Sequence, residues 1–390
     1  MHLFTKGRGP KILLAGLMAP LALLASMGLS APTAAAQEAR LKGWGNNSSY
    51  QLGDSQGGNR LTPATVAGLT DGDVTALAAS SNNGHALALL SNGTVESWGY
   101  NGNGELGIGN TATQAVPGTV AGLSGVVAIA AGNNHSLALL SNGTVEAWGY
   151  NGDGELGDGT TTSRTTPVTV AGLTGVEAIA AGGNHSLAVL ADGTVRAWGY
   201  NGYGQLGDGT TTSRTTPVTV TGLTNVRGVS GGNRHSLARL ADGTVQAWGY
   251  NSDGELGDST TTTRSTPATV ANLANVRDIS AGLYHNLARL SDGTVKTWGN
   301  NSDGELGDST TTNRPIPITV AGVSNVRAIA AGGYHSMVLT SDGHVSTVGR
   351  NNVGQLGDGT TTNRSTVVTP VTGLSSISLI AAGVDFSLAA

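Results

Sequence analysis

Cysteine is absent from the 390 residues, and phenylalanine occurs only twice. A chain without cysteine has no disulfide framework and no thiol nucleophile, so its stability must come from packing. Only 12% of the residues are charged, but a hydrophobic content of 38% with a net charge of −5 excludes a disordered chain.

Glycine is abundant, with 61 residues, and glycine and proline together make up 72 of the 390 residues. This fraction is below that of aperiodic low-complexity chains and far from the one-third glycine of collagen. Each glycine inside a helix costs roughly 0.8–1.0 kcal/mol relative to alanine, which disfavours long helices. The accompanying threonine, valine and asparagine predict many short strands joined by tight turns.

The first 36 residues differ from the rest. Lys6, Arg8 and Lys11 precede an uncharged stretch over residues 12–29 and a small-residue run that ends at Ala36. This layout predicts a secretory signal peptide over residues 1–36, cleaved after Ala36, and one domain over residues 37–390. The uncharged stretch approaches membrane-spanning length, so an uncleaved anchor is the alternative. Pro20 and the Ala-x-Ala pattern favour cleavage.

Cleavage would make the charge more negative. The leader holds three cations and no acidic residue, which leaves 17 Lys and Arg against 25 Asp and Glu, a net charge of −8. Bulk electrostatics therefore gives such a surface no attraction for nucleic acid or anionic lipid. We expect a secreted, periplasmic or cell-envelope monomer of bacterial type that contacts neither nucleic acid nor, once cleaved, the membrane.

A repeat of about 50 residues organises the chain. Tryptophan followed by glycine recurs with this period, and Val348-Gly349 takes the seventh position. A histidine recurs with the same period, and Phe386 takes its next position. The tryptophans are Trp44, Trp98, Trp148, Trp198, Trp248 and Trp298, and the histidines are His85, His135, His185, His235, His285 and His335. A period this long indicates repeated supersecondary units that bury one another's faces.

One unit predicts four strands. Residues 126–131 form a small-residue strand, 135–140 a second, 144–148 a third, and 167–170 a fourth that begins at an edge-tolerant proline. Asn142-Gly143 predicts a hairpin with positive φ at both turn positions. Four-stranded units of this period are typical of propeller blades, and the small strand suits the crowded axis.

The two ends of the chain are complementary. Residues 39–44 carry the strand that contains the tryptophan, with no histidine strand before it. Residues 386–390 occupy the position of the histidine strand, with no tryptophan strand after them. We expect an all-β, seven-bladed β-propeller closed by pairing of its N- and C-terminal strands, which removes a free sheet edge. An open solenoid is the alternative.

These motifs resemble the regulator of chromosome condensation repeat. The resemblance rests on residues 151–160, Pro167, residues 179–188 and residues 192–199, and the pattern covers residues 40–390. It implies a seven-bladed propeller. Known members include a nuclear guanine-nucleotide exchange factor for a small GTPase and secreted bacterial propellers, one an inhibitor of β-lactamase.

The resemblance also implies where exchange activity would lie, in the turn before each histidine. The matching pairs are Asn133-Asn134, Gly183-Asn184, Asn233-Arg234, Leu283-Tyr284, Gly333-Tyr334 and Val384-Asp385. Only Asp385 is acidic, and the inserted wedge and basic tail of the founding member have no counterpart. An exchange-factor-like regulator is therefore the alternative to a binding module.

Three repeated features could suggest chemistry. One histidine per blade cannot converge on a metal ion, because packed sheets lie about 10 Å apart. We expect each histidine to be structural and to hydrogen-bond backbone within its blade. The loop starting at Asn151 lacks the glycine and glutamate of an EF-hand, because Leu156 and Thr162 occupy those positions. We therefore expect an ordinary glycine-rich turn, and a less regular cation site is the alternative.

Arginines 164, 214, 264, 314 and 364 are expected to pair with aspartates 158, 208, 258, 308 and 358 of the same loops. Near-identical blades supply copies of one group, whereas catalysis requires different groups around one substrate. We therefore expect no enzyme activity, no cofactor and no metal.

Departures from the repeat indicate the binding surface. The turn before each histidine and the long glycine-rich loop fall on the same face, and tyrosine and arginine are common binding anchors. We predict that this face binds an unknown protein or cell-envelope component. Its residues are Asn133, Asn134, Asn184, Tyr203, Arg234, Leu283, Tyr284, Tyr334 and Asp385. Neutral drift in exposed turns is the alternative.

Overall fold

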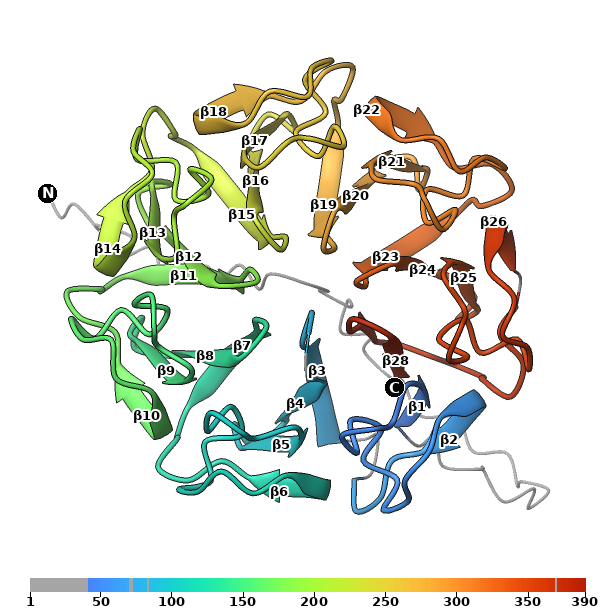
Figure 1. Cartoon of the computed structure of the whole chain (residues 1–390), viewed down its shortest axis with the longest axis horizontal. Helices are drawn as coiled ribbons and strands as arrows, with labels where there is room; N and C mark the ends of the chain where they lie inside the picture. Colours follow the sequence, from blue (N-terminus) through green and yellow to red (C-terminus); the bar gives the residue numbers. More distant parts are fainter. Residues whose placement is uncertain (1–40, 70–72, 83, 369) are drawn as a thin grey trace, which may run out of the picture.

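The computed structural model describes residues 41–69, 73–82, 84–368 and 370–390. These residues form 28 strands in seven four-stranded sheets, arranged as a ring around a central axis (Figure 1). The expected all-β, seven-bladed propeller is confirmed. In the described ranges, no helix is long and apolar enough to cross a membrane. The expected signal peptide and its cleavage site at Ala36 lie outside these ranges.

Six blades are continuous in sequence, and their strands have nearly constant lengths. They are β3 (Val74–Ala79), β4 (His85–Leu90), β5 (Val95–Gly99) and β6 (Gln114–Thr119); β7 (Val126–Ala131), β8 (His135–Leu140), β9 (Val145–Gly149) and β10 (Arg164–Thr169); β11 (Val176–Ala181), β12 (His185–Leu190), β13 (Val195–Gly199) and β14 (Arg214–Thr219); β15 (Val226–Gly231), β16 (His235–Leu240), β17 (Val245–Gly249) and β18 (Arg264–Thr269); β19 (Val276–Ala281), β20 (His285–Leu290), β21 (Val295–Gly299) and β22 (Arg314–Thr319); and β23 (Val326–Ala331), β24 (His335–Thr340), β25 (Val345–Gly349) and β26 (Arg364–Val368).

The seventh blade combines both ends of the chain. β1 (Lys42–Gly45) pairs antiparallel with β28 (Phe386–Ala389), which places Trp44 opposite Ser387. β27 (Ile380–Ala382) and β2 (Arg60–Thr65) complete the sheet in the order β2-β1-β28-β27. The expected closure by terminal strands is confirmed, and the open solenoid is excluded.

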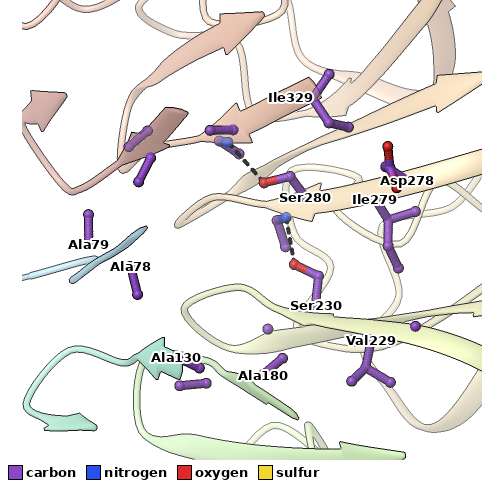
Figure 2. Close-up of a pocket in the computed structure, with 18 of the residues that line it drawn as sticks. Ala78, Ala79, Ala130, Ala180, Val229, Ser230, Asp278, Ile279, Ser280 and Ile329 are labelled. Carbon is purple, nitrogen blue, oxygen red and sulfur yellow. Dashed lines mark hydrogen bonds between the residues drawn. The ribbon is translucent and has the colours of Figure 1, made fainter. Parts of the chain in front are cut away.

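The first strand of each blade lies at the axis and the fourth at the rim (Figure 1). Alanines of the first strands line a central channel of about 350 Å³, together with Ser230 and Ser280. These two hydroxyls accept hydrogen bonds from the backbone N–H groups of Ala281 and Ala331 on the following blades (Figure 2). The small residues thus lie where blades converge, as the sequence predicts.

Two local expectations need correction. The fourth strand of the second continuous blade begins at Arg164, so Pro167 lies inside it, at the irregular register between Arg164 and Val168. A rim strand tolerates this because its outer N–H groups have no neighbouring strand. In the hairpin, φ is positive at Gly143 (81°) but not at Asn142. The Asn142 carboxamide instead accepts from the N–H of Thr144, which makes an Asx turn.

Tryptophans join neighbouring blades. The indole N–H of Trp198 donates to the carbonyl of Glu155 on the preceding blade at 2.8 Å, and its ring is fully buried in a cluster with Leu156 and Val170. Gly157 has a φ of 64°, and a Cβ there would lie 2.8 Å from the indole nitrogen. A side chain at this glycine would therefore push the blades apart.

The repeated histidines also join blades. His135 is buried, and its Nε2 lies 3.0 Å from the hydroxyl of Ser186 on the next blade. That hydroxyl donates to the carbonyl of Glu155 at 2.9 Å. The structural role is as expected, but the expected backbone partner within the blade is wrong, because the ring reaches a side chain across the interface. The same contact joins His85, His185, His235, His285 and His335 to Ser136, Ser236, Asn286, Ser336 and Ser387.

Candidate functional site

The turns before the histidines and the long loops meet on one face, as the sequence predicts. Arg234, in the turn between β15 and β16, donates from Nη1 to the hydroxyl of Tyr203 at 3.0 Å. Tyr203 belongs to the long loop between β13 and β14 on the preceding blade. The turn that follows the first strand of one blade therefore contacts the loop that follows the third strand of the preceding blade.

A continuous row of aromatic rings crosses this face. Ring centroids are 6.3 Å apart for Tyr200 and Tyr203, 5.2 Å for Tyr203 and Tyr250, 6.5 Å for Tyr250 and Tyr284, and 6.4 Å for Tyr284 and Tyr334. We call these five residues the tyrosine band. All five are half-buried and come from four successive blades, so the band offers a broad amphipathic surface.

Two arginines stack on rings of the band. The guanidinium carbon of Arg234 lies 4.7 Å from the ring centroid of Tyr203, and that of Arg350 lies 3.8 Å from that of Tyr334. Arg350 also donates from Nε to Asp303 at 2.9 Å. Cation–π contacts and ion pairs fix these side chains before any partner arrives, which lowers the entropic cost of binding.

A half-buried acid lies beyond Arg350. Burial raises the pKa of the Asp385 carboxyl, while the charge of Arg350 opposes the shift. Asp385 accepts a hydrogen bond from the Gln355 amide at 3.1 Å. Burial also raises the pKa of the Tyr334 hydroxyl. The Arg350 end of the band is therefore a polar cluster with fixed partners.

Not every predicted site residue is available. Asn133 and Leu283 are each only 7% exposed. The backbone N–H of Asn233 donates to the carbonyl of Leu283, and the Asn133 amide lies 3.5 Å from the Asn233 oxygen. These buried residues connect the turns around the axis. They therefore stabilise the face from beneath and are not exposed to a partner.

Two further predicted residues, Asn134 and Asn184, lie in the turns before His135 and His185. Asn134 and Asn184 are half-buried and outside the band, and their carbonyls accept from the N–H groups of Tyr150 and Tyr200 at 2.8 Å. Sequence reasoning brought together Tyr203, Arg234, Tyr284 and Tyr334, which the structure places in contact or in series.

Sequence reasoning missed Tyr200, Tyr250 and Arg350. The two tyrosines follow the Trp-Gly pair, where Tyr100 and Tyr150 also occur, so they resemble ordinary repeat residues. Arg350 replaces tyrosine at this position, and that departure was a usable signal.

The long loops are closed by their own side chains. The amide of Asn151 donates to the carbonyls of Thr160 and Thr162, and its oxygen accepts from the N–H of Leu156 at 2.9 Å. Arg164 pairs with Asp158 at 2.7 Å, and the pairs from Arg214, Arg264, Arg314 and Arg364 repeat this contact, as expected. Among the described residues, no three His, Asp or Glu side chains are grouped to hold a metal ion.

Beneath the loops lie carboxyl groups that sequence reasoning did not single out. Burial raises the pKa of Glu155 to about 7, of Glu255 to about 8 and of Glu305 to about 7. Each accepts the N–H of the residue two positions earlier, as at 2.9 Å from Asp253 to Glu255. The equivalent Gln205 makes the same contact at 3.0 Å, from Tyr203. An amide thus replaces the carboxyl in the same geometry.

The fold, the cross-blade histidines and the repeated loops define a seven-bladed propeller built from one recurring unit. The chain belongs to the RCC1-like domain family, whose family model matches residues 23–320 and 176–390.

The curated relatives match over short segments. The chain is 35% identical over 88 residues to the mitochondrial RCC1 domain-containing protein RUG3 of Arabidopsis thaliana, and 40% identical over 85 residues to the protein RCC2 homolog of Danio rerio. These segments cover 23% and 21% of the chain, and 19% and 17% of the relatives. The match therefore spans about a fifth of each relative.

Solved structures match over nearly the whole chain. Prp20p from Saccharomyces cerevisiae, described with its binding properties to Gsp1p and histones, has a TM-score of 0.80 and 25% identity, covering 91% of this chain and 92% of that one. Human WBSCR16 has a TM-score of 0.79 and 23% identity, covering 90% and 98%. The second likeness shows the fold alone.

Proposed function

We propose that the chain is an exported, non-catalytic binding module that captures a protein or cell-envelope component through the tyrosine band. The observation that carries the proposal is the unbroken row from Tyr200 to Tyr334, with Arg234 stacked on Tyr203 and Arg350 stacked on Tyr334. Tyrosine and arginine are the residue types enriched where binding energy concentrates. The repeat itself does not require this row, because Tyr284 and Tyr334 depart from it.

Substitution of the band tests the proposal. The chain lacking residues 1–36 is immobilised and offered the proteins secreted by the producing organism, and any captured partner is then purified and titrated. Combined alanine substitution of Arg234, Tyr284 and Tyr334 is expected to abolish capture. Alanine at Tyr100 and Tyr150, which share the repeat position of Tyr200 but lie outside the band, is the matched control. Equal capture by the band variant and the control would contradict the proposal.

Export is supported by the basic start, the uncharged stretch and the small-residue run of residues 1–36. N-terminal sequencing of the protein recovered from the medium or periplasm is expected to begin at Gln37. Recovery of the chain in the membrane fraction with its leader attached would favour the uncleaved anchor.

A guanine-nucleotide exchange-like regulator is the second candidate, and the likeness to Prp20p favours it, because that structure is described with Gsp1p binding. One observation argues against it. Exchange activity would lie in the residue pairs before each repeated histidine and before Phe386, and Asp385 is the only acidic residue among these pairs. Release of a fluorescent guanine nucleotide from a purified small GTPase, measured with and without the propeller, separates the two. Accelerated release that is lost on substitution of Asp385 would replace the binding proposal.

A further inference from the structure

Arginines gather at the channel end opposite the tyrosine band. The first strand of a blade runs toward the turn before the histidine, and the second strand runs back from it. Arg227 and Arg277 come second in β15 and β19, and Arg239 comes fifth in β16, so all three lie at the other end. They line the channel together with Asp278, which projects from β19 beside Ile279 (Figure 2).

The second-strand arginines depart from an apolar repeat position. Leu89, Leu139 and Leu339 occupy it in other blades, each opposite an alanine of the first strand. Arg239 instead lies opposite Gly228, and its guanidinium nitrogens are 3.9 Å from where a Cβ of that glycine would stand. The glycine leaves room for the guanidinium against the channel wall.

The positive charge at this end exceeds the negative charge that neutralises it. Asp278 is the acid of the cluster, and Arg289 of the same blade donates to it from Nε at 2.7 Å. Within the described part of the chain, Arg227, Arg239 and Arg277 form no ion pair. Glu177, at the equivalent position of β11, is not within ion-pair distance of an arginine there either.

The guanidinium of Arg239 is anchored to the first strand of its own blade, in spite of the repulsion from neighbouring arginines. Arg239 donates to the carbonyl of Arg227 at 3.4 Å. Burial lowers the pKa of Arg239, Asp278 opposes the shift, and the charges of Arg277, Arg227 and Arg289 add to it. The chain has a net charge of −5, so this cluster is a positively charged region on a negatively charged molecule.

We propose that Arg227, Arg239 and Arg277 form a binding site for the phosphate groups of a small, multiply charged molecule at this mouth of the channel. Planar guanidinium groups match phosphate oxygens through paired N–H donors. Three cations that form no ion pair among the described residues suit a polyvalent phosphate better than a single carboxylate. The channel of about 350 Å³ has room for a small anion and not for a folded partner. The site is independent of the tyrosine band.

Calorimetric titration of the whole domain with pyrophosphate, inorganic phosphate and sulfate tests the site. Pyrophosphate is expected to bind saturably at one site and more tightly than the two smaller anions. The variant Gly228→Ala/Arg239→Leu recreates the alanine–leucine pair of three other blades, so it should fold, and it is expected to weaken pyrophosphate binding by about tenfold or more. Arg196→Gln removes the same charge elsewhere, at a position where the next repeat carries Gln246, and is expected to have little effect.

Three outcomes would overturn the site. One is a wild-type chain that fails to bind pyrophosphate at millimolar concentration. Another is an equal loss of affinity in the Arg196→Gln control, since that would show only the long-range effect of net charge. The third is binding to phosphatidylglycerol vesicles without any response to the soluble anions. The band variant with alanine at Arg234, Tyr284 and Tyr334 should bind pyrophosphate normally, so failure of one proposal leaves the other testable.

Discussion

Phe386 packs in the same buried cluster as Ala86 of the next blade, and each replaces one member of the repeated histidine–serine contact. The blade that lacks the histidine is followed by the blade that lacks the hydroxyl. An unpaired imidazole or hydroxyl buried at this interface would lose its hydrogen bonds, so both polar groups are absent together.

Restoring only one partner should therefore be harmful. We expect Phe386→His alone to lower the free energy of unfolding by about 1–3 kcal/mol, because its Nε2 would face Ala86. Ala86→Ser should recover part of this loss, since its hydroxyl could also reach the carbonyl of Gln51, which already accepts from Trp98. Urea unfolding of both single variants and the double variant measures the coupling. Strictly additive effects would show that the two positions do not interact.

Stability should be greatest in mildly acid solution. The buried histidines have pKa values lowered from 6.5 to about 3 or 4, as in His185 and His135, so the unfolded chain binds protons first as the pH falls below 6.5. The buried glutamates have pKa values raised from 4.5 to about 7 or 8, so the unfolded chain releases protons first as the pH rises above 4.5. Stability is thus lost in both directions, and the maximum lies between these two ordinary pKa values. Urea midpoints across the pH range measure the profile, and a maximum above neutrality would contradict it.

The alkaline loss can be assigned to single residues. Glu255→Gln reproduces the geometry of Gln205 and removes the group whose pKa is raised to about 8. We expect the variant to gain on the order of 2 kcal/mol at alkaline pH and little below pH 4.5. Glu146→Gln, at a position where a later repeat carries Gln246, is the matched control for the loss of one carboxylate, against which the gain is measured. An equal gain at acid and alkaline pH would exclude ionisation as the cause.

The two halves of a loop ion pair should differ in importance. Arg264 is 39% exposed at its side chain and Asp258 only 6%. Asp258 also accepts from the N–H and hydroxyl of Thr260 and from the amide of Asn251. Although burial acts to raise it, hydrogen bonds from Thr260 and Arg264 hold the pKa of Asp258 below its usual value.

We therefore expect Arg264→Ala to cost no more than about 1 kcal/mol and Asp258→Ala to cost about 1–3 kcal/mol. Thermal unfolding at neutral pH compares the two variants directly. Equal costs would mean that the ion pair, and not the loop hydrogen bonds, dominates.

The repeated period predicted the blades because each blade repeats the same hydrophobic spacing, and it placed Arg164 beside Asp158 through their shared loop. It did not predict the partner of His135, because Ser186 lies 51 positions away and the contact depends on how blades stack. Tyr200 and Arg239 were missed for related reasons. Tyr200 looks like an ordinary repeat residue. Arg239 forms a cluster only with arginines on other strands, which the fold brings beside it.

The seventh blade has a consequence for the order of synthesis. β1 leaves the ribosome first among the described strands and β28 last, yet the two are hydrogen-bonded neighbours. β1 must therefore wait for its partner during the synthesis of six intervening blades. A chain interrupted before Phe386 would keep two unpaired sheet edges and an exposed blade interface, which cellular proteases and chaperones can recognise. The last strand to be made thus distinguishes a finished ring from an unfinished one.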